Sequence, residues 1–150
     1  VRLRGQRIYR GPDAMLELEA NSVRAAGRAP SGSLPDTTRV GPVNLAGEIA
    51  DSKCYFGVMN PGRGKVHRGC AARCLSGGIP PVMVSGDRTY VLTGPDGQPI
   101  GGRLLDLVAQ PVELQGELFH ASGTRLIRVY SVGSKVTARK ISLAKTGPMP

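Results

Sequence analysis

Three thiols and one imidazole lie within a short stretch of this chain, residues 51–78. They are spaced C-x12-H-x2-C-x3-C and are Cys54, His67, Cys70 and Cys74. If the residues after Lys65 form a helix, the last three share one helical face, because residues three and four apart lie above one another. Cys54 must reach that face from the preceding loop. Any fold of this chain therefore has to bring Cys54 to the helix.

Three thiols and one imidazole form a ligand set that suits a thiophilic metal. A Cys3His set is one of the structural patterns of zinc, and soft ligands also admit Cu(I), to which Met59 could add a thioether. The spacing is not that of a zinc finger, because no C-x2-C pair occurs. Asp51 lies close to Cys54 in the sequence and could orient His67 from outside the ligand shell. We therefore expect a zinc or copper ion at Cys54, His67, Cys70 and Cys74.

A disulfide is the main alternative to a metal. Cys54 could pair with Cys70 or Cys74 and fix the helix to the chain before it, as happens in oxidising compartments. A bond between Cys70 and Cys74 is less favoured, since these residues lie near the upper limit of disulfide reach on a helix. A third possibility is a thiol-redox or copper-delivery protein, although C-x3-C is not the C-x2-C of thioredoxins. The spacing alone leaves these alternatives open.

Positive charge surrounds this segment and dominates the whole chain. Lysine and arginine total 20 against 11 acidic residues, which gives a net charge of +9. Five cations flank the motif and should favour thiolates by lowering the pKa values of the cysteines; they are Lys53, Arg63, Lys65, Arg68 and Arg73. The excess predicts an anionic lipid surface or an acidic protein as partner, within a membrane-bound assembly, although it could also serve solubility alone. Nucleic acid is an unlikely ligand, because the aromatic residues on which bases would stack are few and dispersed.

The rest of the chain predicts a mainly β fold. With 21 glycines and 12 prolines, the composition favours short strands joined by turns. Alternating apolar residues predict strands at 43–49, 111–121 and 124–132, and two shorter strands at 82–85 and 89–93. A short helix over 67–75 should end at the glycines 77–78, and 103–108 should form a helical turn. These elements predict a small OB-like antiparallel barrel over residues 43–132, with one short helix carrying the Cys/His motif.

The two ends of the chain are expected to lie outside this barrel. Residues 1–40 predict a basic segment, then a β-hairpin over 15–25 centred on Ala20 and Asn21, and a linker over 26–42. The first ten residues could lie beside a membrane or be disordered. Residues 133–150 should form an exposed basic tail. Because the chain starts at Val1, we also expect a leader or membrane anchor that is absent here.

The segment GEIADSKCYFGVMNPGRGKVHRGCAARCLSGGIPPVMV, with the RTYVLTG and VELQGELF strands after it, resembles a group of small exported bacterial proteins. They carry a D-x2-C…H-x2-C-A-x2-C signature on an OB-like barrel, and most have no assigned function. Asp51 and the four donors match this signature. The resemblance implies an extracytoplasmic, periplasmic location. Since no catalytic fingerprint occurs in the sequence, we expect a non-catalytic binding or accessory module, tethered to or associated with a membrane.

Overall fold

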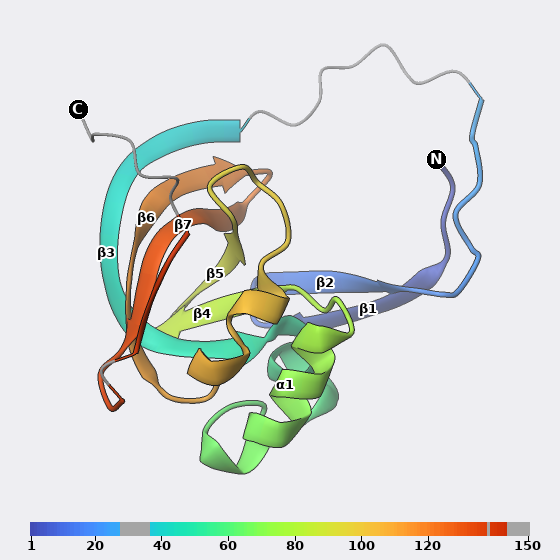
Figure 1. Cartoon of the computed structure of the whole chain (residues 1–150). Coiled ribbons are helices and arrows are strands. Elements are labelled where there is room, and N and C mark those ends of the chain that lie inside the picture. The colour runs from blue at the N-terminus through green and yellow to red at the C-terminus, as the bar shows by residue number, and fades with distance from the viewer. Residues whose placement is uncertain (28–36, 138, 144–150) are drawn as a thin grey trace.

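A computed structural model describes residues 1–27, 37–137 and 139–143 of the chain. Its strands are β1 (Gly5–Arg10), β2 (Asp13–Leu18), β3 (Thr37–Asp51), β4 (Pro81–Ser85), β5 (Arg88–Thr93), β6 (Pro111–Ala121), β7 (Thr124–Ser134) and β8 (Lys140–Ser142). Its helices are η1 (Cys54–Val58), η2 (Lys65–His67), α1 (Arg68–Ser76), η3 (Gly101–Arg103) and η4 (Leu105–Leu107). The fold is mainly β with one short α-helix, as the sequence predicts (Figure 1).

Five of the strands close into a barrel. The long, curved β3 pairs antiparallel with β6 over most of its length and with β4 at its end. The hairpins β4–β5 and β6–β7 complete the wall, and parallel pairing of residues 91–93 in β5 with 126–128 in β7 closes it. Within the barrel, β3 is the first strand and β7 the fifth. The first strand pairs with the second, β4, and with the fourth, β6, while the third, β5, runs parallel to the fifth, which is the strand order of an OB-type barrel. The predicted barrel is therefore confirmed.

The strands of the barrel alternate between its interior and its outer surface. In β4, Met83 points into the main core, whereas Val82 and Val84 belong to a second cluster on the outer side. In β5, Tyr90 and Leu92 join the main core, while Val91 packs outside. Strands that are apolar on both faces read as nearly continuous apolar runs, which explains the sequence PVMVS of β4. The apolar residues on the outer face of β4 and β5 must therefore be covered by another part of the chain.

The last hairpin of the barrel has the bend that its sequence predicts. The β6–β7 pairing shifts register between Gln115 and Gly116, so a bulge lies at the glycine placed in mid-strand. A Cβ atom at Gly116 would lie 2.4 Å from the carbonyl oxygen of Arg128, so only glycine allows this close approach. Ser122 and Gly123 form the turn, both with positive φ. The wall can therefore curve enough to close.

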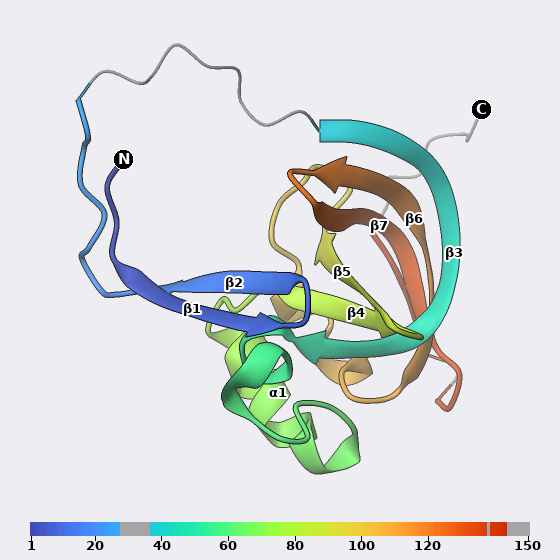
Figure 2. The ribbon, with the colours of Figure 1, turned by 180° about the vertical axis from the view of Figure 1, so that it is seen from behind.

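The N-terminal hairpin differs from the prediction in place and in role. The hairpin predicted over 15–25 is wrong: β1 and β2 pair around Gly11 and Pro12, and the first ten residues supply a strand. Gly11 adopts a φ of 57°, which suits the turn. The β1–β2 ribbon crosses the outer side of β4, as Figure 2 shows, and provides the cover that this wall needs.

The linker and the tail also differ from expectation. Residues 37–42 of the predicted linker belong to β3, and residues 28–36 lie outside the described residues. In the predicted exposed tail, β8 pairs with β7, and Leu143 is buried against the main core. Residues 138 and 144–150 of the tail lie outside the described residues. Within the described ranges, no helix is both long and apolar enough to cross a bilayer.

Candidate metal centre

The Cys/His segment leaves and rejoins the barrel at one point. Asp51, the last residue of β3, faces Pro81, the first residue of β4, so residues 52–80 project from a single rung of the sheet. Directly after β3 the chain coils into η1, which begins at Cys54. The Oδ1 atom of Asp51 accepts a hydrogen bond from the backbone N–H of Cys54 at 2.8 Å. The carboxylate thereby fixes the position of Cys54 at the exit of the strand.

Two of the predicted ligands lie on α1. The helix starts at Arg68, and His67 is the last residue of the short 3-10 turn before it. Cys70 and Cys74 are four residues apart and share a helical face. The neighbouring face carries Ala71 and Leu75 into the main core, which fixes the rotation of the helix on the barrel. The helix ends as predicted, since Gly77 donates its backbone N–H to the carbonyl of Arg73 at 2.9 Å.

The sulfur atoms converge on Cys54. Its Sγ lies 3.9 Å from Sγ of Cys70 and 4.0 Å from Sγ of Cys74. Donor atoms of Cys54, His67 and Cys70 all lie within 4.8 Å of one another, and so do those of Asp51, Cys54 and Cys74. A disulfide has an S–S length of about 2.05 Å, and all three cysteines are free. The four expected ligands thus fall into two groups that share Cys54, and no disulfide, the alternative to a metal, is formed among the three cysteines.

Asp51 joins the imidazole to the strand. Its Oδ2 lies 3.0 Å from Nε2 of His67, and the exposed fractions of the two residues are 0% and 3%. Because Nε2 is occupied by the carboxylate, Nδ1 is the ring nitrogen left for another partner. The buried Asp51 thus has one hydrogen bond on each oxygen, from Cys54 and from His67. Its expected contact with His67 is present.

The surroundings of the thiols raise their pKa values, whereas the sequence predicts that they are lowered. Burial, followed by the nearby Asp51 carboxylate, raises the pKa of the Cys54 thiol far above its ordinary 9.0. The same two causes raise the pKa of Cys74. The flanking arginines were expected to lower these pKa values, but Arg63, Arg68 and Arg73 are exposed to solvent, whereas Asp51 is buried beside the sulfurs. Without a metal, these two thiols therefore hold their protons at neutral pH.

The loop between η1 and η2 is tied closely to the site. Gly62 is buried against the backbone of Cys54 and Tyr55, and an added Cβ would lie 2.5 Å from the carbonyl oxygen of Cys54. The backbone N–H of Gly64 donates to a carboxylate oxygen of Glu48 at 2.5 Å. The backbone N–H of His67 donates to the carbonyl of Gly64 at 2.9 Å. These contacts hold the loop so that it returns the chain from Cys54 to His67.

The N-terminal hairpin packs on the other side of the Cys54 segment. Ile8 and Met15, a cross-strand pair, pack with Tyr55 and Phe56 of η1. The guanidinium carbon of Arg10 lies 4.5 Å from the centre of the Tyr55 ring. Lys53 forms an ion pair with Glu17 of β2. This support is not evident from the sequence, because it depends on a turn at Gly11, whereas the alternation of residues 15–25 predicts the turn at Ala20 and Asn21.

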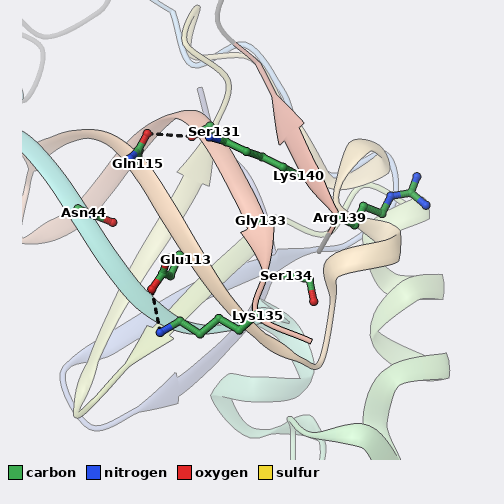
Figure 3. A pocket seen from close by; sticks show the side chains of 9 residues that line it. All are labelled: Asn44, Glu113, Gln115, Ser131, Gly133, Ser134, Lys135, Arg139 and Lys140. Atoms are coloured by element: carbon green, nitrogen blue, oxygen red, sulfur yellow. Dashed lines mark hydrogen bonds and ion pairs between the residues drawn. The ribbon is translucent and has the colours of Figure 1, made fainter. Parts of the chain in front are cut away.

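A polar cavity of about 250 Å³ lies on the far wall of the barrel, along β6, β7 and β8 (Figure 3). Two pairs of its polar side chains bond to each other: Lys135 pairs with Glu113 at 2.9 Å, and Ser131 donates to Gln115 at 3.2 Å. A ligand would have to replace these contacts. The Cys/His cluster is the stronger candidate, because donor atoms that suit a metal ion lie within 4.8 Å of one another there.

Comparison of the chain with protein-family models, with curated proteins and with solved structures gave no match.

Proposed function

We propose that this chain is a non-catalytic, metal-binding module whose ion, Zn²⁺ in the first instance, is held by four side chains at the base of the barrel. The ligands are Cys54, His67, Cys70 and Cys74. The ion would join the exit of β3 to the face of α1 that carries the two remaining cysteines. Asp51 would support the site from outside the ligand shell, as carboxylates commonly do for metal-bound histidines.

The separation of the sulfur atoms is the observation that carries this proposal. Zinc–sulfur bonds are about 2.3 Å long, and a tetrahedron with such bonds separates its sulfurs by about 3.8 Å. The distances from Cys54 Sγ to the other two sulfurs, 3.9 and 4.0 Å, are close to that value and about twice a disulfide bond. An ion shared by Cys54 and either of the other cysteines would therefore need little movement of their side chains, whereas binding by all four ligands would draw the two groups of donors together.

The number and burial of the donors favour a structural role. Four protein ligands fill a tetrahedral shell, whereas catalytic zinc keeps one position for water or substrate. Cys54 and His67 are each only 3% exposed, so the ion would be closed off on the barrel side. The site would thus stabilise a binding or accessory module. The ion would also stabilise the fold of the segment, because α1 contributes only the small Ala71 and Ala72 and the larger Leu75 to the main core.

Elemental analysis of the full chain, purified without chelator, tests the proposal. We expect about one zinc per chain and three thiols that react only after chelation. The variants Cys54→Ser and Cys74→Ser should each lose the ion, while Ser76→Ala, on the exposed side of the helix, should retain it. A metal-free chain with three freely reactive thiols, or an intact mass lower by two hydrogens, would contradict the proposal.

Copper is the second candidate ion, because Cu(I) also prefers thiolate and thioether ligands. Met59 is 45% exposed at the end of η1, and Cys70 is exposed on α1, so both are accessible from solvent. Competition between Zn²⁺ and Cu(I) under reducing conditions separates the two. Retention of zinc against a small excess of Cu(I) would favour the structural site, and complete exchange would favour copper handling.

A further inference from the structure

Three aliphatic side chains are exposed at the two ends of the loop between η1 and η2. Val66 is 86% exposed, Val58 49% and Met59 45%. Figures 1 and 2 show the chain between η1 and α1 at one end of the molecule, beyond α1 and away from the barrel wall. We call these three residues together the loop tip, because the loop that they flank lies at this end of the molecule. Single exposed apolar residues are normal on protein surfaces, so the loop tip needs a second observation before it indicates a contact surface.

The charged residues of the segment that carries the loop tip are all positive, and a carboxylate beside the loop, that of Glu48, accepts the backbone N–H of Gly64. Residues 52–80 contain no aspartate or glutamate. The four exposed cations of this segment are Arg63, Lys65, Arg68 and Arg73. Among the described residues, none of these four forms an ion pair, whereas Lys53 of the same segment pairs with Glu17. The loop tip therefore belongs to a segment whose four exposed cations are not neutralised by ion pairs within the described part of the chain; Arg68 donates to the backbone carbonyl of Asp106 at 3.3 Å.

The backbone presents these side chains in a fixed arrangement. Gly62 packs on the backbone of Cys54, and the N–H of Gly64 is bonded to the carboxylate of Glu48. The N–H of Met59 also donates to the carbonyl of Cys54 at 3.2 Å. Because the loop is anchored at these points, little conformational entropy is lost when its tip meets a partner. The loop tip is thus exposed to solvent although its loop is anchored to the rest of the structure.

We propose that the loop tip and its four cations dock this chain on an anionic lipid surface. The aliphatic side chains would enter the headgroup region, and Arg63, Lys65, Arg68 and Arg73 would contact acidic headgroups. A lipid surface is favoured over an acidic protein, because the apolar residues are aliphatic and project outward. Protein interfaces instead rely on aromatic residues seated in matching pockets. This inference goes beyond the metal site and does not depend on an ion.

Sedimentation with vesicles tests the proposal on the full chain, in whatever metal state it is purified. The vesicles contain phosphatidylcholine alone, or phosphatidylcholine with about a third phosphatidylserine, at physiological salt. We expect binding only to the second kind. Each cation near such a surface contributes about fivefold to the partition coefficient, so Arg63→Glu with Lys65→Glu should weaken it by at least twentyfold. Val58→Ser with Val66→Ser should weaken it by about tenfold or more.

Two matched controls separate the loop from the rest of the surface. Leu16→Ser with Leu18→Ser removes exposed leucines from the outer face of the N-terminal hairpin, and Arg88→Glu with Lys140→Glu makes the same change in net charge elsewhere. Both should stay within about threefold of the original chain, since the first leaves the charge unaltered and the second alters only charge that lies away from the loop. Circular dichroism confirms that each variant is folded.

Three results would overturn the proposal. The first is equal binding by the loop variants and the original chain. The second is a loss of binding in the hairpin or the distant-charge control as large as in the loop variants. The third is no binding to phosphatidylserine vesicles together with binding to polyglutamate that the loop variants lose, which would assign the surface to an acidic protein. None of these depends on whether the chain contains zinc, so the two proposals can fail separately.

Discussion

The carboxylate of Asp51 lies 3.0 Å from Nε2 of His67, and the two side chains are almost completely buried. One residue ends a barrel strand and the other precedes the helix, so this contact closes the part of the segment from Cys54 to His67. The second oxygen of the carboxylate accepts the N–H of Cys54. A single side chain therefore positions donors from both ends of the segment. It does so without being one of the four proposed ligands.

Asp51→Asn should weaken zinc binding by about 10–100-fold, since partners that orient a metal-bound histidine contribute that much to affinity. The amide retains one oxygen, so it cannot serve Cys54 and His67 as the carboxylate does. Competition with a chromogenic chelator measures the change. Asp87→Asn, in the exposed β4–β5 turn, is the matched control and should leave the affinity unaltered. Equal affinities of the two variants would remove Asp51 from the site.

Removal of the ion should loosen the segment while the barrel persists. Helix α1 reaches the main core through Ala71 and Leu75, whereas the barrel is closed by its own strand pairings. Hydrogen exchange before and after chelation should therefore show faster exchange in residues 65–76 by tenfold or more, with little change in β6 and β7. Uniform loss of protection across the barrel would show that the ion is required for the whole fold.

The metal-free chain should lose stability on the alkaline side. The pKa values of Cys54 and Cys74 are raised above their ordinary 9.0 by burial, and the pKa of Tyr130 is raised above 10.0, also mainly by burial. For each group the folded state holds its proton more tightly than the unfolded state. Their contribution is thus complete below about pH 9 and declines as pH rises through the folded pKa values.

The urea midpoint of chelated, reduced protein measures this decline and should be lower at pH 10 than at pH 7.5. In Cys54→Ser with Cys74→Ser, the difference between the two midpoints should shrink, because the remaining Tyr130 titrates later. A midpoint that rises with pH in the metal-free chain would contradict the expected sign.

Two glycines of the Cys/His segment should respond oppositely to alanine. Gly62→Ala places a Cβ 2.5 Å from the Cys54 carbonyl oxygen, so the loop must shift and both stability and zinc affinity should fall. Overpacking of this kind costs about 1–3 kcal/mol. Gly69→Ala meets no atom within 4 Å and lies in α1, so it should stabilise the chain by up to about 1 kcal/mol. Thermal unfolding compares the pair, and a neutral Gly62→Ala would show that the loop is not held there.

Much of the barrel could be predicted from local pattern. The strands at 111–121 and 124–132, the bulge at Gly116 and the end of the helix at Gly77 follow from periodicity and turn chemistry, which are properties of neighbouring residues. The N-terminal hairpin was misplaced because its inner face is only a pair, Ile8 and Met15, which is too short to show a period. This pair packs against residues of η1 and β4 that are far away in the sequence, so nothing near the hairpin reveals its inner face.

The candidate site was predicted as a set of residues, although its electrostatics were not. Spacing places Cys70 and Cys74 on one helical face, and the proximity of Asp51 to Cys54 suggests a supporting carboxylate. The raised pKa values could not be foreseen, because the sequence shows that arginines are near but not that they point into solvent. The contacts of Glu48 with Gly64 and of Glu17 with Lys53 likewise depend on tertiary structure alone.

The pairing of Asp51 with Pro81 means that residues 52–80 enter and leave the barrel through one narrow neck. An insertion attached in this way can vary in length and content during evolution while the surrounding wall keeps its geometry. Deletion of residues 52–80 would still expose part of the barrel core to solvent, since Leu75 is one of the buried residues of that core. The segment is therefore attached to the barrel at a single point, yet it contributes a side chain to the core of the barrel.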